Sequence, residues 1–182
     1  MHSSIFVSKI QILIGFKPIM LLMNSNHDVV RSKIRWMIIL FVVLLILSGL
    51  TAFPLQTGIN SLAEIKSIFP AFLQNWIETI QIGINDTWPK YPFIAYGTDW
   101  LGFAHIMIGM AFIGVYKEPV RNKWIIQWAI LCCIAVLPLA LICGPIRQIP
   151  WFHIIIDCSF GIVGIVPFLL VKKWISQLEN IQ

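Results

Sequence analysis

Four stretches of this chain are apolar over about the length that a helix needs to cross a membrane. A spanning helix requires roughly 20 mostly apolar residues to cover ~30 Å of hydrocarbon. The stretches are separated by polar breaks, so they predict several spans rather than one buried core. We therefore expect an all-α integral membrane protein: a four-helix transmembrane bundle with an outer amphipathic helical segment.

The predicted boundaries follow the polar breaks and the prolines. The four spans are residues 34–54, 97–116, 124–143 and 151–171. Pro54 ends the first span, and Pro138 interrupts the third, where a bundle tolerates it as a kink. The remaining parts are a leader (residues 1–33), an outer segment with a turn (55–96), a short inner loop (117–123), a short outer loop (144–150) and a tail (172–182).

Composition supports the membrane assignment. Hydrophobic residues make up 58% of the chain and charged residues 12%, whereas ordinary soluble domains carry roughly 25% charged residues. The formal net charge of +5 raises the question of a nucleic-acid partner. The basic residues flank apolar segments instead of forming a basic face, so we expect no nucleic-acid partner.

The basic flanks predict the orientation. They precede the first span, fill the loop between the second and third, and follow the fourth: Arg31, Lys33, Arg35, Lys117, Arg121, Lys123, Lys172 and Lys173. Because cytoplasmic loops are enriched in lysine and arginine, these flanks place both termini in the cytoplasm. We expect the inner (plasma) membrane of a bacterium.

The first 22 residues fit this pattern poorly. Ile5 to Met23 is apolar, but Lys9 and Lys17 leave runs that are too short to span. A signal peptide would need a small-residue cleavage site, and Leu21-Leu22-Met23 does not supply one. Two interpretations stay open: an upstream extension from a misassigned start codon, or an interfacial helix on the inner leaflet.

The outer segment carries the pattern of an amphipathic helix. Apolar residues recur at steps of three and four: Leu62, Ile65, Phe69, Phe72, Leu73, Trp76, Ile77, Ile80 and Ile84. Pro70 lies inside the pattern, and an interior proline loses a backbone hydrogen bond, so we expect a break there. Residues 59–84 either fold back as a cap over the outer ends of the spans, which we favour, or lie on the outer leaflet.

Five ionisable residues lie at or inside the ends of the apolar segments: Asp99, His105, Arg147, His153 and Asp157. An ionisable side chain in a membrane costs several kcal/mol unless it is paired or hydrated, so such residues are candidates for a functional site. Counted from the predicted outer edge at 1.5 Å per residue, His105 lies about 12 Å deep and Asp157 about 9 Å deep. The other three form a shallower layer.

Helical spacing places both histidines on stripes with small residues. Gly102, His105 and Gly109 share one stripe, and His153, Asp157, Gly161 and Gly164 share another. Small residues mark the faces where membrane helices approach closely. We therefore expect both polar stripes to face the interior of the bundle.

These residues support two interpretations of function. In the first, His105 pairs with Asp157 and Arg147 with Asp99, and the pairs fix how the helices pack in a structural or accessory protein. In the second, the His105–Asp157 pair relays protons in a small transporter or acts as base and orienting acid in a membrane enzyme. The sequence does not decide whether the chain is an enzyme.

Little in the sequence predicts a bound group. His105, His153 and Asp157 could ligate a metal, but His/Asp pairs at helical spacing are more common than metal sites. The depths of His105 and His153 differ too much for a shared haem, and the cysteines form no C-x-x-C motif. We expect no cofactor and no resident metal. The expected partners are the lipid bilayer and a further membrane protein or a second copy of the chain.

Overall fold

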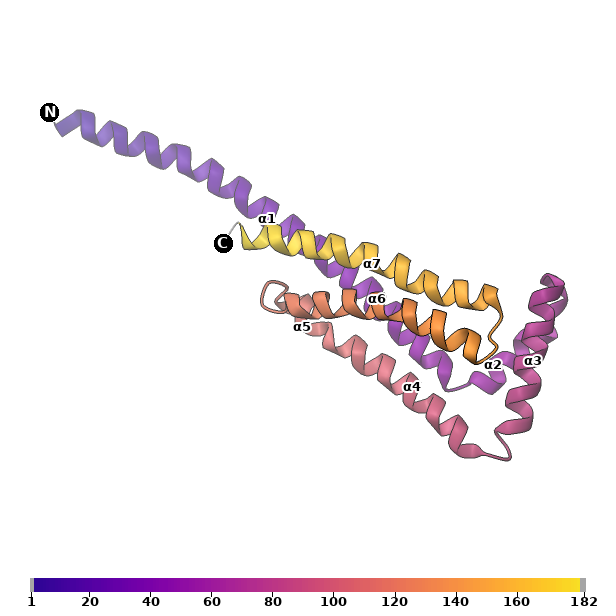
Figure 1. The fold of residues 1–182 in the computed structure, drawn as a ribbon. Coiled ribbons are helices and arrows are strands. Elements are labelled where there is room, and N and C mark those ends of the chain that lie inside the picture. Colours follow the sequence, from indigo (N-terminus) through magenta and orange to yellow (C-terminus); the bar gives the residue numbers. More distant parts are fainter. Residues whose placement is uncertain (1, 181–182) are drawn as a thin grey trace. The chain divides into compact units, whose positions relative to one another are not determined.

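The computed structural model describes the backbone of residues 2–180 and the side chains of residues 27–180. Within that range every regular element is helical, which confirms the all-α class. In chain order the elements are α1 (His2–Ala52), α2 (Leu55–Glu64), the 3-10 turn η1 (Lys66–Ile68), α3 (Ala71–Thr87), α4 (Pro92–Ala111), α5 (Ile113–Lys117), α6 (Lys123–Ile146) and α7 (Trp151–Glu179) (Figure 1). The side chains on which both interpretations of residues 1–22 depend lie outside the described residues.

Among the described residues, four helical segments are long and apolar enough to cross a membrane: His27–Ala52, Pro92–Lys117, Lys123–Ile146 and Trp151–Glu179. The last three contain the predicted spans and extend beyond them, whereas the first begins before residue 34 and ends at Ala52, two residues before the predicted end at Pro54. Helix α4 begins early because Pro92 occupies its first turn, where the missing N–H costs no hydrogen bond. Helix α7 continues past residue 171 because Ile175 and Leu178 extend its apolar stripe and are fully buried.

The chain divides into two compact units, Met1–Ile39 with Ile113–Gln182 and Leu40–Phe112, and each is described by itself. In the first unit α6 and α7 pack along each other. A Cβ added at Gly161 would lie 2.6 Å from the carbonyl oxygen of Cys133, and one at Gly164 would lie 3.0 Å from its Sγ. These two glycines therefore mark a close helix contact, as their spacing predicted.

Buried side chains of this unit gather toward one end of the α6–α7 pair, where α5 and residues 34–38 of α1 also lie. They are Ile34, Ile38, Val115, Ile125, Ile126, Ala129, Phe168, Val171, Ile175 and Leu178. The predicted basic flanks bracket this end. The best-packed part of the unit is therefore next to its charged part.

In the second unit α1 and α4 meet at glycine. A Cβ added at Gly102 would lie 2.7 Å from the carbonyl oxygen of Gly49, and one at Gly49 would lie 2.7 Å from that of Gly102. Real Cβ atoms are not found that close to backbone oxygen. Two turns further along α4, Gly109 packs against Ile46. The small residues of the predicted α4 stripe thus lie at a helix contact.

Helices α2 and α3 form an antiparallel hairpin with its own small core. The break expected at Pro70 is confirmed, since Pro70 immediately precedes α3. Ile59, Ala63 and Ile77 are buried, and four partly buried residues pack against them: Leu62, Phe69, Ile80 and Ile84. Much of the apolar face that the sequence showed is therefore used between the two helices.

Four amide side chains join the same two helices and are called the amide ladder below: Gln56, Asn60, Gln81 and Asn85. Gln56 donates to Asn85 Oδ1 at 2.9 Å, and Asn85 donates to Asn60 Oδ1 at 2.8 Å. Gln81 donates to the same Asn60 oxygen at 3.1 Å. An ion pair between Lys66 Nζ and Glu78 Oε2, at 2.9 Å, joins the turn to α3.

The α1–α4 contact predicts opposite effects for two glycine substitutions on one helix. Gly102→Ala should lower the unfolding temperature in detergent, because overpacking costs roughly 1–3 kcal/mol, more than the ~1 kcal/mol of helix propensity that alanine gains. Gly97→Ala is the control, since nothing lies within 4 Å of a Cβ at Gly97, and it should leave the unfolding temperature equal or raise it. Equal unfolding temperatures for both variants would show that the helices are not in contact at Gly102.

Candidate functional site

The five predicted site residues fall in two units. Asp99 and His105 lie on α4, in the unit of residues 40–112. Arg147 follows α6, and His153 and Asp157 lie on α7, all in the other unit. Of the five, the structure brings His153 and Asp157 together. The pairs His105–Asp157 and Arg147–Asp99 would join the two units, so they stay predictions.

His105 has a partner on its own helix. Its Nδ1 lies 2.8 Å from the carbonyl oxygen of Leu101, one turn earlier. A carbonyl oxygen only accepts, so this contact requires a proton on Nδ1, and in the neutral ring it leaves Nε2 as the acceptor. The residue also lies on the face of α4 that packs against α1, because a Cβ at Gly49 would lie 2.9 Å from His105 Cβ.

His153 and Asp157 are one turn apart on α7. His153 Nε2 lies 3.8 Å from Asp157 Oδ1, which is too long for a hydrogen bond but close enough for an ion pair when the ring is protonated. The two side chains are 39% and 42% exposed, so neither is sealed in the protein. Helical phase places Asp157 beside Gly161, near the contact with α6, and His153 at the margin of that contact.

Arg147 is positioned by the tight turn that ends α6. Ile149 N–H donates to Gly144 O at 2.9 Å, and Gln148 N–H donates to Pro145 O at 3.0 Å. These are the two hydrogen bonds of a Schellman motif, with Arg147 as the C-cap and Gln148 in the left-handed position. Gln148 has a φ of 58°, which usually requires glycine. The turn therefore fixes the backbone of Arg147 at the price of a strained neighbour.

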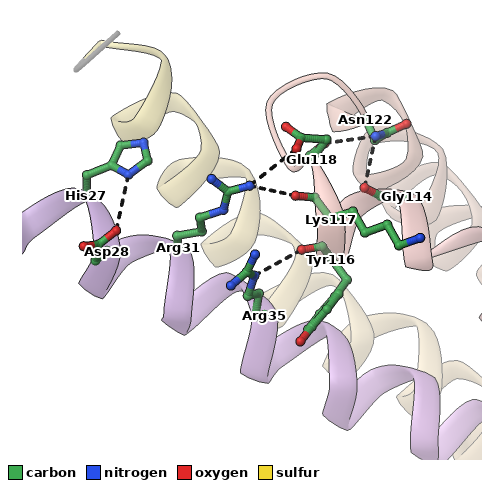
Figure 2. Close-up of polar contacts among 9 residues, drawn as sticks. All are labelled: His27, Asp28, Arg31, Arg35, Gly114, Tyr116, Lys117, Glu118 and Asn122. Atoms are coloured by element: carbon green, nitrogen blue, oxygen red, sulfur yellow. Dashed lines mark hydrogen bonds and ion pairs between the residues drawn. The ribbon is translucent and has the colours of Figure 1, made fainter. Parts of the chain in front are cut away.

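Two arginines that the sequence suggested only as flanking charges cap a helix (Figure 2). Arg31 donates from one terminal guanidinium nitrogen to the carbonyl oxygen of Lys117 at 2.8 Å, and the same nitrogen lies 3.6 Å from Glu118 Oε1. Arg35 Nε donates to the carbonyl oxygen of Tyr116 at 3.3 Å, and its guanidinium carbon lies 5.2 Å from the centre of the Tyr116 ring. Both arginines lie on α1, so they fasten it to the end of α5.

Asn122 completes this cap from the other side (Figure 2). Its Nδ2 lies 3.0 Å from the carbonyl oxygen of Gly114 and 3.0 Å from that of Glu118. The last carbonyls of a helix have no partner within it, and a positive charge there also opposes the helix dipole. Arg31, Arg35 and Asn122 together supply those partners. Asn122 contacts carbonyl oxygens four and eight residues earlier, so its position shortly after the helix could have suggested a cap. Arg31 lies 86 residues from Lys117, and no local sequence pattern links the two.

The described residues include no group of three His, Cys, Asp or Glu side chains placed to hold a metal ion. Comparison of the chain with protein-family models, with curated proteins and with solved structures finds no match. The interpretation of the site therefore depends on the geometry described above.

The strained turn beside Arg147 predicts a stabilising substitution. Gln148→Gly should raise the free energy of unfolding by roughly 0.5–1 kcal/mol, because glycine adopts a positive φ without a Cβ clash. The unfolding temperature should rise accordingly. Gln148→Ala is the matched control, since it shortens the side chain but keeps the Cβ, and it should give no gain. An equal rise for both variants would locate the effect in the side chain instead of the backbone.

The arginine cap predicts that two neighbouring basic residues differ in importance. Arg31→Gln should destabilise the protein by about 1 kcal/mol, since it removes a charged donor from a helix-end carbonyl. Lys33 lies two residues after Arg31, and its side chain is exposed and makes no such contact in the described structure. Lys33→Gln also removes one positive charge, and it should leave stability unchanged. Thermal unfolding of both variants at low and high salt tests this. Equal losses would show that net charge matters more than the cap.

Proposed function

We propose that the chain is a four-span membrane protein with both termini in the cytoplasm and a structural or accessory role in docking a further membrane protein or a second copy. The observation that carries the structural role is that polar residues of the candidate site have partners on their own helix. His105 contacts Leu101 O, and His153 faces Asp157. Such contacts lower the cost of placing polar groups among apolar helices.

Three further features support this proposal. The helix contacts are made at glycine on α1, α4 and α7, as is typical of helices that associate in lipid. The basic residues of the predicted inner side include Arg31 and Arg35, whose contacts at α5 fit a clamp at that side. Many large apolar side chains of the four long helices are exposed, as contact with lipid requires.

A second candidate is a proton-coupled transporter or membrane enzyme that uses the His105–Asp157 pair. The contact with Leu101 O favours it, because the neutral ring of His105 then presents Nε2 as a proton acceptor. The side chain of Asp157 is 42% exposed, so it has room for a further contact.

Substitutions that keep shape but remove charge separate the two candidates. If the role is structural, Asp157→Asn and His105→Gln should each cost about 1 kcal/mol, which lowers Tm by roughly 2–4 °C for a chain of this size. Asp86→Asn is the control, since that carboxylate pairs with Lys90 at an exposed site, and it should leave Tm unchanged. Thermal unfolding in detergent and growth of cells that carry each variant are the two measurements.

The contrary result is equally clear. Variants at Asp157 and His105 that keep the parent Tm but reproduce the growth defect of cells without the gene would overturn the structural role. That outcome would favour the proton-transfer candidate.

A further inference from the structure

The α2–α3 hairpin has one polar broad face and one apolar broad face. On α3, residues 74, 78, 81 and 85 follow helical steps along one side, and the last two belong to the amide ladder. Phe72 and Trp76 lie about half a turn away, on the opposite side of α3. On α2, Gln56 and Asn60 share the ladder face, while Leu55 and Leu62 lie on the other side of the contact with α3.

Exposed apolar side chains concentrate at the end of the hairpin where α2 turns into α3. Ile65, Ile68 and Phe72 are 50%, 72% and 51% exposed; we call these three residues the hairpin tip. The amide ladder makes its hydrogen bonds within the hairpin. Exposed clusters of large apolar side chains, such as the tip, mark interaction surfaces.

The connections to the neighbouring helices restrict where that partner can be. Helix α1 ends at Ala52 and α2 begins at Leu55, while α3 ends at Thr87 and α4 begins at Pro92. Both neighbours are apolar enough to span a membrane. Figure 1 draws α3 crosswise to α4, within the same unit. A hairpin held by such short connections, across the direction of a spanning helix, must stay close to the membrane surface.

Exposed aromatic residues also lie at the start of α4, which follows the other end of α3: Tyr91, Phe93, Tyr96 and Trp100. Tyrosine and tryptophan prefer the depth of the lipid headgroups. The charges of the hairpin exclude attraction to anionic lipid as the driving force. Residues 55–87 hold three acidic residues and one basic residue, and that lysine, Lys66, is paired with Glu78.

We propose that the α2–α3 hairpin lies on the outer lipid surface, with the hairpin tip and the Phe72–Trp76 side inserted at the headgroup level and the amide ladder facing water. The contact is apolar, so it takes neutral lipid. This inference rests on the proposed membrane placement of α1 and α4. It decides between the two positions that the sequence left open for residues 59–84, in favour of the leaflet.

Site-specific photocrosslinking tests the orientation on the full chain in phosphatidylcholine nanodiscs. Separate variants carry p-benzoylphenylalanine in place of Phe72, Glu64 or Leu44, and lipid adducts are measured by mass spectrometry. Phe72 should give several-fold more lipid adduct than Glu64, which is exposed on the ladder side of α2 near the same turn. Replacing part of the lipid with phosphatidylglycerol should leave the Phe72 yield unchanged.

Leu44 separates failure of this inference from failure of the membrane placement. It is an exposed residue in the middle of the apolar part of α1, so it should give lipid adduct wherever the hairpin lies. Lipid adduct at Leu44 with protein-internal adduct, or none, at Phe72 would overturn the hairpin proposal and favour a cap. Equal lipid yields at Phe72 and Glu64, or a Phe72 yield that rises with anionic lipid, would overturn it too. Absence of lipid adduct at Leu44 would overturn the membrane placement itself.

Discussion

Close contact between helix backbones at glycine is the feature on which the rest of this structure depends. Apolar side chains gain little from leaving lipid for another apolar surface, so helices in a membrane need tight van der Waals contact instead. Gly49 and Gly102 bring α1 and α4 within reach, and Gly161 does the same for α7 and α6. The polar residues of the candidate site lie beside these contacts. The glycines therefore set how close His105 and Asp157 come to neighbouring helices.

The second constraint is the supply of partners for helix-end carbonyls. At α5 the partners are side chains, from Arg31, Arg35 and Asn122. At α6 the partners are backbone N–H groups in a turn that places Gln148 at a positive φ. At α5 the arginine side chains lose conformational freedom, and at α6 Gln148 adopts a strained backbone conformation. In both cases the backbone carbonyl groups at the helix end gain hydrogen-bond partners. The basic residues Arg31 and Arg35, which the sequence suggested as flanking charges, thus also serve packing.

The long helices were predictable because their signal is local. An apolar run of the required length, or Pro70 inside a periodic pattern, needs no knowledge of the rest of the chain. The pairing of α2 with α3 was not predictable in this way, since an amphipathic stripe is satisfied equally by lipid, by a bundle or by a second stripe. The amide ladder joins Asn60 to Asn85, and Arg31 reaches residue 117. Both contacts depend on tertiary arrangement that no short window encodes.

The candidate site shows the same division. The spacing of His153 and Asp157 predicts their proximity on one helix, and the structure has it. The His105–Asp157 pair depends on how two units meet. His105 nevertheless carries information of its own, because its contact with Leu101 O fixes the proton on Nδ1 in the neutral ring. A purely structural histidine needs only that contact. A proton-transferring one also needs a group that meets Nε2, so the identity of that group is what separates a packing residue from a working one.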